Sequence, residues 1–169
     1  MIAVRRAIAI ALAGVIAIGA GTAVASAAKE PEVVVASGKM DGRFRTDSLF
    51  HIDEFWMQVN SGTEFHRWLS RGLHKKVVVS LTTSADELND EKDTRILTGT
   101  LIHQTAPREG PGAGARLPHG DSGLAHILYL QDDLSGSLGA VTFETADRLT
   151  AQKFDVYDGK RVTVIIRIK

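Results

Sequence analysis

The chain has 169 residues, with 20 Lys and Arg balanced against 20 Asp and Glu, and it contains no cysteine. The absence of cysteine excludes disulfides, thiolate metal sites and a cysteine nucleophile. The two signs of charge are interspersed along the chain, which is unlike the basic footprint of a nucleic-acid-binding protein. We therefore expect no nucleic-acid partner.

The first 27 residues have the organisation of a secretory signal peptide. Arg5 and Arg6 form a short positive region, and an apolar run spans residues 7–18. Ala25-Ser26-Ala27 fits the small-x-small rule, so we expect cleavage after Ala27. The apolar run is shorter than the roughly 20 residues of a membrane span, so we expect no stable anchor after cleavage. A secreted or periplasmic protein is predicted; a retained N-terminal anchor is the alternative.

Residues 28–169 have the length of a single domain. Without Arg5 and Arg6, 18 basic residues face 20 acidic ones, so the charge stays close to balance. A domain of this size buries roughly two-thirds of the surface that its unfolded chain exposes. With no disulfide available, its core alone must hold it together.

Strand-like patterns of β-branched and bulky residues recur along this domain. In chain order they fall at residues 33–35, 50–59, 76–83, 95–104, 124–130, 138–144 and 161–168. Residues 146–153 are ambiguous and include a short helix as one interpretation. Asp158-Gly159 is a tight-turn signal that leads into the last strand.

One amphipathic helix is predicted between the second and third of these patterns. Ser61 and Glu64 form a Ser-x-x-Glu capping box. Four apolar residues then follow at helical spacing: Phe65, Trp68, Leu69 and Leu73. We expect a helix over about residues 62–71, with this apolar stripe packed on a sheet.

Residues 104–123 form a long segment rich in glycine and proline. The segment holds three of the four prolines and five glycines, without periodic apolar residues. Loops of this length are usually functional or disordered. We expect a loop here, and we expect it to be a contact element for a partner.

These patterns predict a mainly β fold: a small barrel or rolled antiparallel sheet of about six strands with one helix packed over it. The phrase Gly159-Lys160-Arg161-Val162-Thr163-Val164 looks like a strand opening of small closed barrels of the OB or SH3-like kind. That resemblance concerns the fold and implies no function.

A candidate nucleophile lies in Gly120-Asp121-Ser122-Gly123, which resembles the segment around the nucleophile of chymotrypsin-like serine proteases. A nucleophilic serine needs a histidine base and an acid that orients it. The residue after Gly123 is Leu124, and no matching histidine segment lies upstream. Composition alone also produces such tetrapeptides in a Gly-rich loop, so this motif weighs little beside a structural role.

Histidines cluster around the same loop. His103 ends one predicted strand, His126 lies at the start of the next, and His119 lies between them with Asp121. If the two strands pair as a long-looped hairpin, His103 and His126 approach each other. Two imidazoles and the Asp121 carboxylate suit a divalent transition metal. The competing interpretation is that both histidines are satisfied core residues on an apolar strand face.

The aromatic residues Phe55, Trp56, Phe65 and Trp68 form a third candidate group. Exposed, they can stack on a sugar or a peptide; at strand and helix spacing they more often belong to the core. Adjacent strand residues point to opposite faces. One of Phe55 and Trp56 must therefore face away from the core, and we single out Trp56 as a binding residue.

The sequence contains no coherent catalytic constellation, which favours a non-enzymatic binding or envelope-accessory domain outside the cytoplasm. Its expected partner is a protein or a glycan of the cell envelope, and no cofactor is predicted. The binding candidates are Trp56, His119, Asp121 and Ser122. The alternative is a small hydrolase or metal-dependent enzyme that uses His103, Asp121, Ser122 and His126.

Overall fold

The structure is a computed structural model that describes residues 31–43, 48–83, 90–107, 121–131 and 138–169. The predicted signal peptide lies outside the described residues. Within them, no helix combines the length and apolar character needed to cross a membrane. The elements are, in chain order, β1 (Val33–Arg43), β2 (Leu49–Ile52), β3 (Phe55–Val59), α1 (Glu64–Ser70), β4 (Lys76–Thr82), β5 (Thr94–Pro107), β6 (Asp121–Gln131), β7 (Leu138–Asp147), α2 (Arg148–Asp155) and β8 (Arg161–Ile168).

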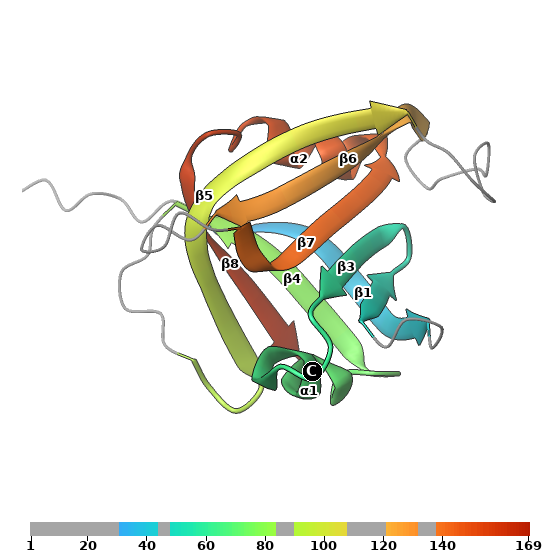
Figure 1. Ribbon diagram of the computed structural model, residues 1–169, viewed down its shortest axis with the longest axis vertical. Helices are drawn as coiled ribbons and strands as arrows, with labels where there is room; N and C mark the ends of the chain where they lie inside the picture. Colours follow the sequence, from blue (N-terminus) through green and yellow to red (C-terminus); the bar gives the residue numbers. More distant parts are fainter. Residues whose placement is uncertain (1–30, 44–47, 84–89, 108–120, 132–137) are drawn as a thin grey trace, which may run out of the picture.

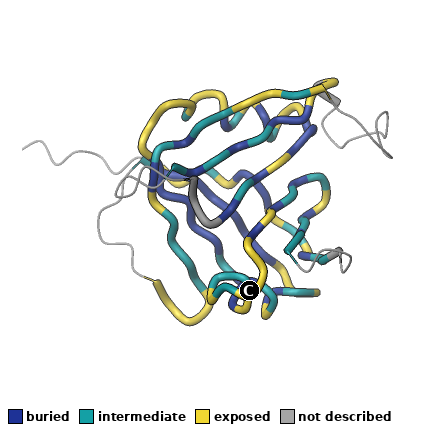
Figure 2. Tube along the Cα trace, in the orientation of Figure 1, coloured by how far each residue is buried: buried dark blue, intermediate teal, exposed yellow. Residues whose placement is uncertain are grey.

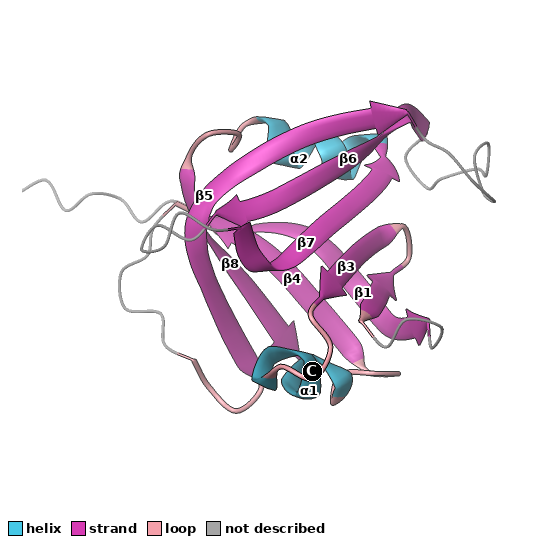
Figure 3. Cartoon of the chain, viewed as in Figure 1, coloured by secondary structure: helices cyan, strands magenta, loops and turns pink. Residues whose placement is uncertain are grey.

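The described strands form a closed antiparallel barrel (Figures 1 and 3). Their order around the barrel is β1-β2-β3-β7-β6-β5-β8-β4, and β4 pairs with β1 to close it. The prediction of a mainly β barrel is confirmed. The described residues form eight strands and two helices, where about six strands and one helix were expected. An OB fold has only five strands, so that resemblance does not describe this barrel.

The strand predicted over residues 50–59 is two strands. β2 and β3 form a hairpin in which Ile52 pairs with Phe55, so only Asp53 and Glu54 make the turn. Asp53 has a positive φ of 49°. Aspartate tolerates this left-handed conformation better than most residues, which is why the chain reverses here without a glycine.

Strand β5 is long because it pairs with two neighbours in succession. Residues 94–100 pair with β8, and residues 100–107 pair with β6. Gly99 lies at the change of partner, where a Cβ atom would stand 2.2 Å from the backbone oxygen of Gln131. Only glycine lets the two backbones approach this closely.

The two helices begin at side-chain caps. Thr63 caps α1, and its Oγ1 accepts a hydrogen bond from the backbone N–H of His66 at 3.1 Å. The predicted cap at Ser61 is therefore wrong by two residues. Asp147 caps α2 in the same way and accepts from the backbone N–H of Thr150 at 3.0 Å. The ambiguous segment after residue 145 thus becomes a helix because an aspartate satisfies its first free donors.

The helices lie at opposite ends of the barrel (Figure 1). Next to α1, a Cβ on Gly72 would meet Met40 near the end of β1 and Ile168 at the end of β8. Lys153 of α2 instead donates to the backbone oxygen of Val34, near the start of β1. Figure 2 shows the buried positions along the strands between the two ends. Inward side chains fill this space, among them Met57, Leu101, Leu128 and Phe143, each at most 1% exposed.

Candidate functional site

The register of β5 and β6 brings two histidines to one inward-facing patch at the α2 end. His103 pairs with Leu128, and His126 pairs with Thr105. Leu128 is fully buried and points into the barrel, so His103, its partner across the strands, points inward as well. His126 lies two residues from Leu128 on the same face. The two imidazoles are therefore diagonal neighbours in one sheet.

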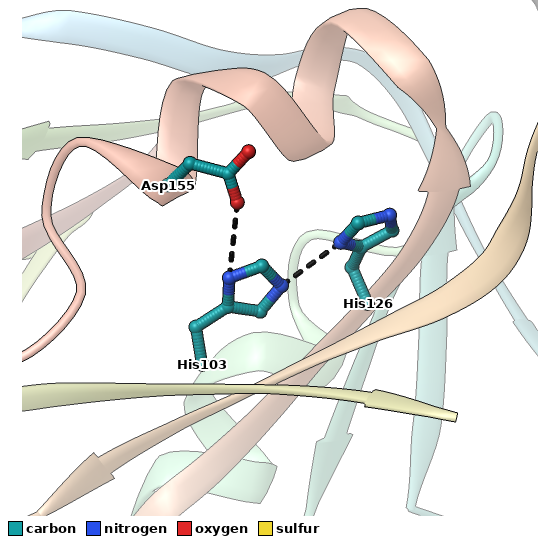
Figure 4. A group of neighbouring side chains, drawn as sticks. All are labelled: His103, His126 and Asp155. Carbon is teal, nitrogen blue, oxygen red and sulfur yellow. Dashed lines mark hydrogen bonds and ion pairs between the residues drawn. The ribbon is translucent and has the colours of Figure 1, made fainter.

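A carboxylate from α2 completes a chain of three side chains (Figure 4). Nε2 of His103 lies 2.9 Å from Nδ1 of His126. Nδ1 of His103 lies 3.0 Å from Oδ1 of Asp155. The two rings are 5.0 Å apart between centroids and tilted by 27°. Asp155, His103 and His126 thus form a continuous relay, which we call the histidine relay.

The turn that follows α2 fixes Asp155 over His103. The backbone N–H of His103 donates to the carboxylate of Asp158 at 2.9 Å. Gly159 donates to the backbone oxygen of Leu101, and Leu101 donates to that of Lys160, both at 2.9 Å. These three bonds attach the α2–β8 turn to β5 immediately beside the relay. These bonds hold the end of α2, and with it Asp155, close to His103.

The hydrogen-bonding capacity of each group defines the protons of the relay. An ionised carboxylate only accepts, so Nδ1 of His103 carries a proton toward Asp155. In the neutral ring, Nε2 of His103 is then an acceptor and receives the Nδ1–H of His126. Nε2 of His126 is left with a bare lone pair. Within the described part of the chain, this atom is buried and has no hydrogen-bond partner.

Burial keeps His126 in its neutral form. Its side chain is 8% exposed, and desolvation lowers its pKa below the ordinary histidine value. Protonation of His103 would lower this pKa further, while the Asp155 carboxylate opposes both effects. A neutral, buried imidazole with a free lone pair is a costly group for a folded core, about 1–3 kcal/mol when it remains unpaired. Such groups recur at functional sites.

A groove runs between β6 and α2 beside the relay. It has a volume of about 270 Å³, and its lining comprises Leu124, His126, Arg148, Ala151, Gln152 and Asp155. Two relay residues therefore face a space that a ligand can enter. The groove offers apolar carbon, an imidazole, a guanidinium, an amide and a carboxylate within one small area.

Exposed apolar side chains gather around α2. Four large hydrophobic residues of the described chain are exposed: Val34, Leu124, Leu149 and Val156. Leu149 lies in α2, Val156 is its C-cap, and Leu124 lines the groove. The backbone oxygen of Val34 accepts from Lys153 of the same helix. All four therefore surround one end of the barrel, whereas singly exposed apolar residues are normally scattered.

The sequence candidates on the Gly/Pro-rich segment have different outcomes. The expected loop is shorter than residues 104–123, because β5 continues to Pro107 and β6 begins at Asp121. Residues 108–120, and with them His119, lie outside the described residues. Asp121 and Ser122 are strand residues whose side chains are also outside the description, and Asp121 pairs with Asp147 of β7. The carboxylate observed beside the two histidines is Asp155.

Trp56 lies on the outer wall of the barrel. Phe55 is 3% exposed and points into the core, so Trp56 points outward. Its ring stacks on His51 of β2, with centroids 4.5 Å apart and planes 28° apart. Trp68 is buried, and Phe65 packs partly buried against the core. Of the aromatic candidates on strand β3, only Trp56 remains available at the surface.

Asp155 was the member of the relay that sequence reasoning missed. It lies four residues after Ala151 and next to Phe154, the two buried residues of α2, so helical spacing places it beside the buried face. Recognition of Asp147 as an N-cap would have identified the segment that follows it as a helix. The pairing of Asp155 with His103 still depends on where the barrel places α2.

Comparisons with known proteins complete the description of the site. No protein-family model, no curated protein and no solved structure matches the chain significantly.

Proposed function

We propose that this protein is an exported, non-enzymatic binding domain whose binding surface is the α2 end of the barrel. The observation that carries the proposal is the exposure of Val34, Leu124, Leu149 and Val156 around α2, where Leu124 lines the groove that contains His126. Exposed apolar surface beside an unpaired buried polar atom favours a ligand that covers the first and pairs with the second.

The chemistry of this surface favours a protein partner. Its exposed apolar residues are aliphatic, which suits a polypeptide better than the aromatic platforms that stack on sugars. Nε2 of His126 is buried without a partner among the described residues, so a partner group that reaches it after a small side-chain movement would carry an N–H or O–H donor. The base of the Gly/Pro-rich loop adjoins the groove, because Leu124 pairs with Pro107. This proximity supports that loop as an additional contact element.

Site-specific photo-crosslinking tests this surface. A photoreactive residue replaces Gln152, which is exposed and lines the groove, or Lys75, which is exposed near α1. We expect one discrete protein adduct from position 152 and none from position 75. Leu149→Asp should suppress that adduct without changing the circular dichroism spectrum. Adducts of equal yield from both positions would contradict the proposal. An adduct with a glycan would show that the partner is a glycan and not a protein.

Export is tested separately. The predicted signal peptide implies that protein recovered outside the cytoplasm begins at Ala28. Intact-mass measurement of that fraction gives the N-terminus directly. A chain that still begins at Met1 would contradict cleavage, but would not affect the crosslinking result.

The relay favours a hydrolase as the second candidate function. A carboxylate that orients one histidine, which in turn contacts a second, is an arrangement that can hold a general base. Its nucleophile would be Ser122, as the sequence motif suggested. A serine-directed fluorophosphonate distinguishes the two functions. Labelling that Ser122→Ala and His126→Ala abolish would establish the enzyme, whereas a binding domain remains unlabelled.

A further inference from the structure

We propose that the histidine relay is a binding site for one divalent transition metal ion, Zn²⁺ or Cu²⁺, held between Nε2 of His103 and Nδ1 of His126. This inference deepens the proposed function, because the same histidine lines the binding groove. The metal itself is bound by the chain alone. Its test therefore requires neither export nor a partner.

The spacing of the two nitrogens is close to that of a metal-ligand pair. Tetrahedral Zn²⁺ with bonds of about 2.0–2.1 Å places two nitrogen ligands about 3.3 Å apart. The nitrogens lie 2.9 Å apart in the hydrogen-bonded relay. An opening of about 0.4 Å brings the nitrogens to this spacing, and His126, one of the two rings, lines the groove.

Asp155 has the geometry of a positioning carboxylate. Metal-bound histidines commonly donate their other ring N–H to a carboxylate, which fixes the tautomer and orients the ring. The Nδ1–H of His103 points at Asp155 in this way, at 3.0 Å. The ligand atoms of all three side chains lie within 4.8 Å of one another, so Asp155 can also approach the ion. The negative charge of Asp155, together with that of Asp158, which accepts a hydrogen bond from the His103 backbone N–H, favours a cation here.

The donor set selects the class of metal. Imidazole nitrogens suit Zn²⁺, Cu²⁺ and Ni²⁺, whereas Ca²⁺ and Mg²⁺ require oxygen ligands. Two protein nitrogens leave further coordination positions for water or for a group in the groove. Arg148, which also lines the groove, favours an anionic group at those positions.

Metal binding changes the polarity of the groove without releasing a proton. The ion occupies the lone pair of His103 Nε2 and requires a lone pair on His126 Nδ1. The proton of His126 therefore moves from Nδ1 to Nε2, and both rings remain neutral. Nε2 is thereby converted from an acceptor to a donor. The metal-loaded groove then favours a carboxylate or carbonyl of the partner, where the metal-free groove favours an N–H or O–H donor.

Nitrogen-15 NMR of the wild-type full chain tests this change directly. On addition of one equivalent of Zn²⁺, we expect His126 to change from the Nδ1–H to the Nε2–H tautomer, while His103 keeps its proton on Nδ1. His51, which stacks on Trp56 on the outer wall, is the internal control and should not change. Unchanged His103 and His126 signals at saturating Zn²⁺ would overturn the proposal. No variant is needed, so misfolding cannot obscure this result.

Calorimetric titration with Zn²⁺ compares the affinity of the wild type with that of matched variants. His103→Ala and His126→Ala should each weaken binding about 100-fold or more, and Asp155→Asn about 10–100-fold, since loss of such outer carboxylates has that effect. His51→Ala and His74→Ala should bind Zn²⁺ with wild-type affinity. The second variant is a control for the other histidine–carboxylate pair, the exposed one between His74 and Asp41. Equal affinity in the wild type and both relay variants would overturn the site. Crosslinking from position 152 in the presence of a chelator tests the partner surface independently, so the two failures are distinguishable.

Discussion

Trp68 at the α1 end and His126 at the α2 end both place a ring nitrogen in the core, and the hydrogen bonding of these two nitrogens differs. At the α1 end, Nε1 of Trp68 donates to the backbone oxygen of Lys92 at 3.0 Å. At the α2 end, Nε2 of His126 is buried without a partner among the described residues. A paired polar group contributes to stability, whereas an unpaired one costs free energy. The difference accords with the proposal that the α2 end binds a ligand, whereas the contacts at the α1 end stabilise the fold.

The neighbours of the two nitrogens agree with this division. Leu69 of α1 is fully buried, and the guanidinium of Arg95 lies 5.1 Å from the Trp68 ring centroid. Around α2, by contrast, Leu149 and Val156 are 44% and 60% exposed. Folded proteins leave such apolar surface exposed at one place mainly where a partner covers it.

Truncation in the α1 end should be the most destabilising change. Leu69→Ala removes a fully buried side chain and leaves a cavity, which should lower the free energy of unfolding by about 3 kcal/mol. Denaturant unfolding monitored by circular dichroism measures this effect. Leu149→Ala, the same truncation on exposed α2, is the control and should change stability by less than about 0.5 kcal/mol. Similar losses of stability in both variants would contradict the difference proposed between the α1 and α2 ends.

The hydrogen bond of the Trp68 ring nitrogen at the α1 end should contribute measurably to the free energy of unfolding. Trp68→Phe keeps an aromatic ring but removes the N–H donor to Lys92 and weakens the contact with Arg95. We expect a loss of about 2 kcal/mol in the free energy of unfolding. If the variant is as stable as the wild type within error, the hydrogen bond of Trp68 Nε1 does not stabilise the α1 end, and the contrast with His126 fails.

A salt bridge on the barrel wall provides a pH-dependent reference that belongs to neither helix. Glu32 bonds to Arg167 of β8 and to Ser80 of β4. The hydrogen bond from Arg167 is the main reason that the pKa of Glu32 lies below its ordinary value of 4.5, with Ser80 adding to it and burial opposing it. A lowered folded-state pKa stabilises the protein above pH 4.5, and this stabilisation is lost as the pH falls through the folded pKa.

Glu32→Gln should therefore cost about 1 kcal/mol of unfolding free energy at pH 7, and progressively less below pH 4.5. Unfolding midpoints of wild type and variant across this range measure the difference. Glu144→Gln, at an exposed position on β7, is the matched control for the loss of one surface carboxylate. A constant difference between wild type and Glu32→Gln at all pH values would exclude the carboxylate charge as its origin.

Removal of the relay should have the smallest effect on stability. The double substitution His103→Leu/His126→Leu replaces both hydrogen-bonding rings by apolar side chains and removes the unpaired Nε2. Because both partners are replaced together, unfolding free energy should stay within about 1 kcal/mol of the wild type, while Zn²⁺ binding is lost. A loss as large as that of Leu69→Ala would show that the relay is a structural element of the core, contrary to the comparison.

Local sequence patterns predicted most of the individual elements. The strands near residues 76–83, 138–144 and 161–168 were found because β-branched residues recur between turn signals. Helix α1 was found from its apolar spacing, although its cap is Thr63 and not Ser61. The hairpin at Asp53 was missed because a positive φ at an aspartate has no strong sequence signal.

The candidate site was only partly predictable. Hairpin pairing of β5 and β6 was enough to suggest that His103 and His126 approach each other, because parity places them on one face. Asp155 lies 29 residues beyond His126 in the sequence, and only the return of α2 across the barrel end brings it to His103. No pattern of local spacing encodes that contact.

The sequence by itself thus determined the β-rich class, the inward parity of both histidines and the segments from which the barrel is built. Tertiary structure alone decided that eight strands close into a barrel, since closure depends on pairings between segments far apart in the chain. It also decided that Asp155 completes the relay and that His126 is left with an unpaired nitrogen. Both facts are properties of packing, because burial and hydrogen-bond satisfaction depend on what surrounds a residue and not on its own chemical type.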